Sequence, residues 1–170
     1  MWLLVWLVKD EHSVQAEFVR VLEMDAVANL GEVGNPAHAE CGGFVKCFLC
    51  AQGKAIVLAT PIYHNGVSGV LKNALDQLAI RHFYLKPVGL ASHGGSRTTQ
   101  AVEQLRIITR GMLGYAIATQ VCTAREDYAP TKCGEGIALT APALVERVDL
   151  FCRELDVMAR VMKYARELMG

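Results

Sequence analysis

The sequence has no excess of charge of either sign. Seventeen Lys and Arg residues balance seventeen Asp and Glu residues among its 170 residues. The chain therefore has no net positive charge that would attract it to nucleic acid or to an anionic membrane. Binding to a polyanion is disfavoured as the main function.

Long hydrophobic runs are also absent. The most apolar stretch, residues 1–8, is much shorter than the roughly 20 residues that span a bilayer. It looks like the core of a signal peptide, but no basic residue precedes it and no small-x-small cleavage site follows before Lys9. We expect a buried first strand there and no membrane partner.

The cysteines do not form a disulfide or metal pattern. Six of them are scattered along a chain that is large enough to fold without staples, which predicts a cytoplasmic protein with reduced thiols. Cys47 and Cys50, with Cys41 nearby, leave open a redox or zinc site. No second Cys-x-x-Cys or spaced His pair accompanies them and their neighbours are apolar, so buried thiols are favoured and no metal is expected.

What the sequence does contain is an alternation of short apolar runs with longer segments of helical period, typical of βαβ units. We predict one domain over residues 1–170, an α/β fold with a doubly wound five-stranded parallel sheet and helices on both faces. The expected strands are residues 3–8, 26–30, 55–60, 87–92 and 116–121, and the expected helices are 13–24, 39–52, 69–80, 98–113 and 142–168. Repeats and low-complexity segments are absent.

Ligands of open parallel sheets bind at the carboxyl ends of the strands. Two of the loops expected there carry recognisable sequences. Residues 61–66 read Pro-Ile-Tyr-His-Asn-Gly and are followed by Val-Ser-Gly-Val-Leu-Lys-Asn-Ala-Leu-Asp to position 76, and residues 92–97 read Ser-His-Gly-Gly-Ser-Arg. With the Lys-Pro-Val at 86–88, these segments resemble those of the NADPH-dependent FMN reductase family.

The resemblance implies a flavodoxin-like fold, FMN as cofactor and NAD(P)H as hydride donor. No catalytic acid or base is required, because the flavin carries the chemistry. Glycines at 66, 94 and 95 would let backbone N–H groups approach the pyrimidine edge of the isoalloxazine ring. The expected cofactor-binding residues are Pro61, Ile62, Tyr63, His64, Asn65, Gly66, Ser92, His93, Gly94, Gly95, Arg97 and Ser13.

The first phosphate loop departs from the family. The family has Gly-Ser-x-Arg-x-x-Ser between its first strand and helix, where this chain has Leu7-Val-Lys-Asp-Glu-His-Ser13. Phosphate sites use glycine to expose N–H groups at a helix N-terminus, and Asp10 and Glu11 would repel the anion. Lys9, His12 and Ser13 compensate in part, so an FMN site roughly tenfold to a hundredfold weaker is expected.

The function implied is hydride transfer from NAD(P)H to FMN, then electron transfer to a small acceptor: a quinone, an azo or nitro compound, a metal oxyanion or free flavin. By the same resemblance we expect a homodimer or homotetramer. The alternative is a non-catalytic flavodoxin-like paralogue that serves as an oligomeric scaffold or partner subunit. Arg97 has two interpretations, a phosphate contact or an ordinary arginine at a helix start.

Overall fold

A computed structural model describes residues 3–10, 13–19, 55–130 and 137–169 of the chain. Its centre is a parallel sheet of three strands in the order β3-β4-β5, which are Ile56–Pro61, Pro87–Gly94 and Tyr115–Ala124. β3 and β4 are almost entirely apolar because both of their faces are covered, as is usual for parallel strands. The expected strands at 55–60, 87–92 and 116–121 are confirmed within a few residues.

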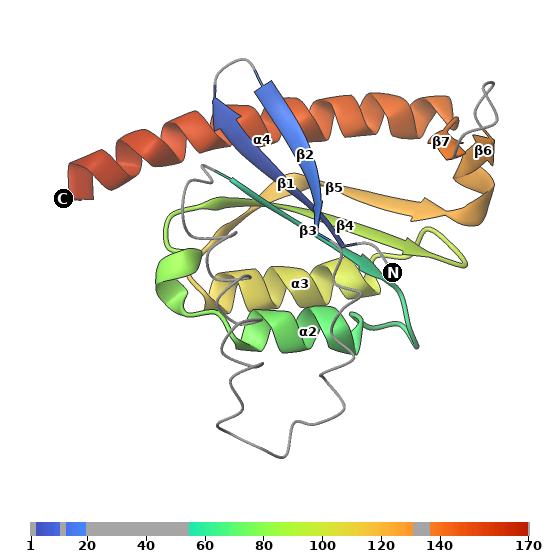
Figure 1. The fold of residues 1–170 in the computed structure, drawn as a ribbon, viewed down its shortest axis with the longest axis horizontal. Coiled ribbons are helices and arrows are strands. Elements are labelled where there is room, and N and C mark those ends of the chain that lie inside the picture. Colours follow the sequence, from blue (N-terminus) through green and yellow to red (C-terminus); the bar gives the residue numbers. More distant parts are fainter. Residues whose placement is uncertain (1–2, 11–12, 20–54, 131–136, 170) are drawn as a thin grey trace.

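Helices cover both faces of this sheet (Figure 1). α2 (Gly69–Asp76) and α3 (Gln100–Gly111) pack on one face, where Leu71, Leu75, Val102 and Leu105 join Leu58 and Leu90 in one core. α4 (Pro142–Met169) crosses the other face, where Phe151, Leu155 and Ala159 pack on Val57, Ile117 and Val121. The doubly wound arrangement is therefore confirmed for this part of the chain.

Smaller elements complete the described region. The 3-10 helix η2 (Ile80–His82) follows α2, which ends before the expected position because Ala79 takes an extended conformation. After β5, the 3-10 helix η3 (Arg125–Asp127) leads into β6 (Tyr128–Pro130). β6 pairs antiparallel with β7 (Ile137–Leu139), and α4 begins shortly after it.

The amino-terminal part differs from the prediction. β1 (Leu3–Asp10) pairs antiparallel with β2 (Ser13–Val19), so the helix expected over residues 13–24 is wrong for residues 13–19. The apolar residues there fit two patterns. Residues 14, 18, 21 and 22 share one face of a helix, but residues 14, 16 and 18 also alternate with polar neighbours, as in a strand. Period two prevails because residues 13–19 pair with β1.

The five-stranded parallel sheet is therefore not confirmed, since three parallel strands are described. The strand expected at 26–30 and the helix expected at 39–52 lie outside the described residues. β1 lies beside β3 but runs in the opposite direction (Figure 1), and it pairs with β2 in a separate two-stranded sheet, so it does not take the place of the parallel first strand in the order 2-1-3-4-5 of flavodoxin-like sheets.

Close packing between β4 and α4 generates a stability prediction. A Cβ atom added at Gly89 would lie 2.9 Å from Cε2 of the buried Phe151 ring, closer than real Cβ atoms come. Gly89→Ala should lower the free energy of unfolding by about 1–3 kcal/mol. Urea unfolding followed by circular dichroism measures this loss.

The matched control is Gly95→Ala, because an added Cβ at Gly95 meets nothing within 4 Å. It should leave the unfolding midpoint almost unchanged. Equal losses in the two variants would contradict the close contact between Gly89 and Phe151.

Candidate functional site

Three loops meet at the carboxyl edge of the sheet. The strand register aligns Pro61 of β3 with His93 of β4, and His93 with Thr123 of β5. The Ile62 N–H continues this alignment by donating to the His93 carbonyl at 2.8 Å. The two loops that the sequence pointed to are therefore adjacent, and the loop after β5 joins them.

The first loop is a tight turn built by residues 63–66. Tyr63 and Gly66 exchange two backbone hydrogen bonds of 3.2 and 2.9 Å. The two residues between them have positive φ angles, 49° for His64 and 62° for Asn65, which is the conformation of a type I′ hairpin turn. The turn leaves the Tyr63, His64 and Asn65 side chains exposed, with 55% of Tyr63 accessible.

Side chains from neighbouring elements hold this turn. Gln104 of α3 accepts from the Val67 N–H at 3.1 Å and donates to the Asn65 carbonyl at 3.3 Å. The sequence analysis missed Gln104, because a single exposed glutamine on a helix carries no signal of a long-range contact. It fixes the turn against α3 from outside.

Buried hydroxyls join the end of β3 to the start of α2. The Ser68 N–H donates to Thr60 Oγ1 at 3.0 Å, and Ser68 Oγ accepts from the Leu71 N–H at 3.2 Å as the N-cap of α2. Lys72 forms a surface ion pair with Asp76 at 2.6 Å. Most contacts of the motif after β3 thus fix the conformation of the loop at 61–68 and of α2.

The second loop follows β4. Ser92 is buried, His93 and Gly95 are exposed, and a Cβ atom at Gly94 would come within 3.1 Å of the Ile62 side chain. Gly94 therefore allows the two loops to approach each other closely. At Gly95 an added Cβ meets nothing within 4 Å, so this stretch of main chain borders open space.

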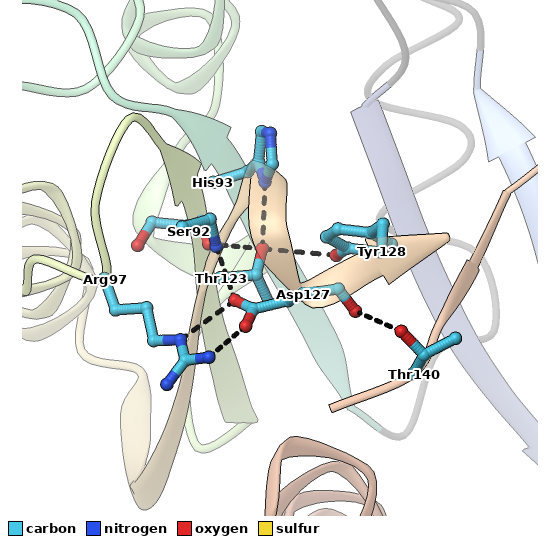
Figure 2. Close-up of polar contacts among 8 residues, drawn as sticks. Ser92, His93, Arg97, Thr123, Asp127, Tyr128 and Thr140 are labelled. Atoms are coloured by element: carbon cyan, nitrogen blue, oxygen red, sulfur yellow. Dashed lines mark hydrogen bonds and ion pairs between the residues drawn. The ribbon is translucent and has the colours of Figure 1, made fainter. Parts of the chain in front are cut away.

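A hydroxyl network lies beneath His93, as Figure 2 shows. Thr123 donates to the Ser92 carbonyl at 3.3 Å and accepts from the Tyr128 hydroxyl at 3.2 Å. Its oxygen is 3.0 Å from His93 Nδ1, and the His93 and Tyr128 rings meet edge to face at 5.6 Å. The Thr123 hydroxyl has one proton, which it donates to the Ser92 carbonyl, so it accepts a hydrogen bond from His93. This arrangement favours a His93 ring with a proton on Nδ1, and Nε2 is the ring nitrogen that makes no bond to Thr123.

Arg97 forms an ion pair across the site rather than standing alone. Its Nε donates to Asp127 Oδ2 at 3.0 Å and its Nη2 contacts Asp127 Oδ1, in a two-pronged pair shown in Figure 2. The Asp127 side chain is fully buried and also accepts from the Ala124 N–H at 2.7 Å. These hydrogen bonds, led by those from Arg97, hold the pKa of Asp127 below its usual value although burial opposes this; the same pair raises the pKa of Arg97.

Asp127, Thr123 and Tyr128 were also missed from the sequence. They follow the last strand, β5, whose loop carries no motif like those at 61–66 and 92–97. The general rule that all parallel strands end at one edge was the signal that could have found them. Asp127 is the most connected of them, since its carbonyl also accepts from the Thr140 N–H at 2.8 Å.

Ser13 lies apart from the expected arrangement. It is the first residue of β2 and pairs with Asp10 of β1, so no helix begins at this position. The helix expected to begin at Ser13 is therefore wrong, and the role of Ser13 in cofactor binding stays a prediction. The Cys41, Cys47 and Cys50 group lies outside the described residues, and among the residues the structure does describe no cluster of metal-ligating side chains occurs.

A cavity of about 680 Å³ lies at the opposite, amino edge of the sheet. Its walls come from the end of α3, the start of β5 and the end of α4, and include Tyr84, Arg106, Ile107, Arg110, Tyr115 and Met169. None of the expected cofactor-binding residues lines it.

No helix in the described part of the chain is long and apolar enough to cross a membrane.

The comparisons with solved structures define the class of fold. An oxidoreductase from Corynebacterium diphtheriae aligns with 78% of this chain and 65% of its own, at 19% identity and a TM-score of 0.54. The apo form of an NADH:FMN oxidoreductase aligns with 84% of this chain and 70% of its own, with the same identity and TM-score. The protein has a flavodoxin-like α/β fold.

The sequence comparisons point to one family. Residues 47–127 match the model of the NADPH-dependent FMN reductase family. An FMN-dependent NADPH-azoreductase from Staphylococcus aureus (strain USA300) is 44% identical over 80 residues, and the same enzyme of strain COL matches equally. The matched region is 46% of this chain, and it spans 43% of the length of these curated relatives.

The Asp127 pair generates a pH prediction. Because the pKa of Asp127 is lower in the folded than in the unfolded protein, its stabilisation is present above the unfolded value, about 4, and is lost as the pH falls below it. Asp127→Asn should be less stable than wild type at pH 7, and the difference should shrink on acidification. Urea unfolding between about pH 7 and pH 2.5 measures it.

Asp76→Asn provides the control, since Asp76 forms only an exposed pair with Lys72. Its stability should stay close to that of wild type at every pH, as expected of a surface ion pair. A constant gap between wild type and Asp127→Asn across the pH range would show that the charge of Asp127 does not act in this way.

Proposed function

We propose that the protein is a flavin-dependent NAD(P)H oxidoreductase. The observation that carries this proposal is the meeting of the two family loops, residues 61–66 and 92–95, at the carboxyl edge of a flavodoxin-like sheet. A bound flavin would accept hydride from NAD(P)H and pass electrons to a small acceptor. The chain's own residues supply position and surroundings for that group.

The residues present fit the ring portion of a flavin. Gly94 and Gly95 keep side chains away from one stretch of main chain, and space remains open beside Gly95. The rigid turn at 63–66 forms the neighbouring wall, where the exposed Tyr63 offers an aromatic surface. His93, oriented by Thr123, can hold a proton at the same edge.

The acceptor is proposed as a class. Azo compounds come first, because the matched relatives from Staphylococcus aureus are named azoreductases. Quinones, nitro compounds, metal oxyanions and free flavin remain in the same proposal. A single domain over residues 1–170 and a cytoplasmic location stay predictions from the sequence.

The open space at Gly95 provides the sharpest test of the cofactor position. Gly95→Leu adds a side chain where nothing lies within 4 Å, so the protein should fold normally. The leucine would occupy the space proposed for the flavin edge and should weaken flavin binding at least about tenfold. Flavin fluorescence quenching measures affinity, and thermal unfolding checks the fold.

Gly111→Leu is the matched control, because Gly111 also has open space but lies in α3 near the far edge of the sheet. It should bind flavin as wild type does. Retained flavin bands that NADPH bleaches anaerobically would support the proposal in the wild-type protein. Absence of flavin binding and of NADPH oxidation with added FMN would reject it.

The alternative function is a non-catalytic flavodoxin-like subunit. One observation favours it: β1 leads into a hairpin instead of a helix whose N-terminus could bind phosphate. This alternative predicts a stably folded protein with no flavin affinity at working concentrations. The spectrum after mixing with FMN and desalting separates the two functions.

We also propose that the protein forms a homo-oligomer. Along α4, exposed apolar side chains recur every three, four or seven residues at Leu150, Val157, Val161, Tyr164 and Leu168, each more than half exposed. Such spacing is typical of a helix face that packs against another helix. A homodimer formed by this face is therefore favoured.

Charged side chains on that face should separate the subunits. Val161→Glu combined with Leu168→Lys should convert an oligomer into a monomer of about 18.5 kDa, because burying both charges at an interface is costly. Size-exclusion chromatography with light scattering measures the mass. The control pair, Lys163→Glu and Glu167→Lys, exchanges the charges of an exposed ion pair that lies to one side of this face of α4. A wild-type protein that is monomeric throughout would contradict the proposal.

A further inference from the structure

We propose that the Arg97–Asp127 pair is a clamp for the loop after β4 and that Arg97 does not bind the flavin phosphate. The consequence is a change in ligand class: flavins with and without the 5′-phosphate bind with similar affinity. This inference rests on the proposed function for its flavin part. The clamp itself is a property of the flavin-free protein.

The first step is the state of the Arg97 guanidinium. Its two donors on one side are directed at the fully buried Asp127 carboxylate. The Ala124 N–H occupies the same carboxylate at 2.7 Å. Turning these two donors toward a ligand phosphate would leave a buried carboxylate without its counter-charge, which is strongly unfavourable.

The second step is what this pair connects. Arg97 lies just after the glycine loop of β4, whereas Asp127 closes η3 after β5. The Asp127 carbonyl also accepts from Thr140, which precedes α4. Asp127 therefore ties three segments together at the edge where Gly94 and Gly95 lie, the loop after β4 and the end of β5 through its carboxylate and the segment before α4 through its backbone carbonyl. Arg97 and Asp127 are positioning residues for that loop.

The third step concerns the phosphate position that the fold normally provides. In flavodoxin-like proteins a helix N-terminus after the first strand supplies backbone donors for the anion. Here β1 continues into β2, with Asp10 paired to Ser13. The described chain offers no helix N-terminus at that position.

Other described cations near this edge have carboxylate neighbours. Lys72 of α2 pairs with Asp76, and Arg125 is exposed on η3, next to Glu126 in the chain. Among the described residues, the groups that remain for a flavin are the main chain at Gly94 and Gly95 and the turn at 63–66, and these face a ring system equally well in riboflavin and in FMN. Recognition through the ring predicts little discrimination for phosphate.

The experiment compares dissociation constants for FMN and riboflavin by fluorescence quenching. Wild type should bind the two flavins within about threefold of each other. Arg97→Lys retains the charge but loses the two-pronged geometry, and Asp127→Asn removes the counter-charge. Both variants should weaken both flavins by the same factor, about tenfold, whereas Arg110→Lys at the far end of α3 should change neither.

A phosphate ligand would behave differently. If wild type binds FMN at least about tenfold more tightly than riboflavin, and Arg97→Ala removes that preference, Arg97 is the phosphate ligand and the proposal is overturned. If Arg125→Ala removes the preference instead, the loss of phosphate discrimination is overturned.

Hydrogen exchange in the flavin-free protein tests the clamp independently. Backbone amides in residues 92–98 should exchange at least about threefold faster in Arg97→Lys and Asp127→Asn, while amides in the first turns of α2 stay unchanged. Unchanged exchange in residues 92–98 overturns the clamp. A wild-type protein that binds neither flavin overturns the proposed function and the flavin selectivity, and the exchange rates still decide the clamp.

Discussion

Parallel pairing of β3, β4 and β5 is the constraint on which the rest of the described structure depends. Because the strands run the same way, their carboxyl ends share one edge, and residues far apart in sequence, such as Pro61, His93 and Thr123, lie at one level. Helices on both faces bury the strands and leave their ends as the place where polar side chains gather. The site is thus a consequence of topology before any single side chain is considered.

The three parallel strands and the helices α2, α3 and α4 could be predicted because each carries one unambiguous period, whereas the short η2, η3, β6 and β7 carry none and were not predicted. Residues 55–60 are continuously apolar, and α3 repeats apolar residues at helical spacing. The segment at 13–19 could not be predicted in the same way, since Val14 and Phe18 fit both a helix and an alternating strand. Pairing with β1 decides between the two, and pairing partners are not visible in a local pattern.

The candidate site was only partly predictable for a related reason. The glycines and the turn residues at 63–66 stand in a contiguous motif, so their neighbourhood could be inferred from the chain alone. Gln104 and Asp127 act at a distance, across 39 residues to Asn65 and across 30 residues to Arg97. Single polar residues of this kind leave no periodic trace, and the functional interpretation of Arg97 depended on a partner that the sequence did not indicate.

The two halves expected of a flavin site therefore rest on different physical foundations in this chain. The half proposed to face a ring is built from main chain, and its geometry is enforced by buried hydroxyls, Gln104 and the Arg97–Asp127 pair. The half that would face a phosphate requires fixed donors or a cation without another partner. The cation nearest the glycine loop in sequence is Arg97, and it is already paired with the buried carboxylate of Asp127. A loop held by its own ion pair is ordered before a ligand binds, so the free energy of binding is not reduced by the entropy lost on ordering the loop. In the proposed site, such a loop would keep affinity for a flat aromatic ligand without requiring affinity for an anion.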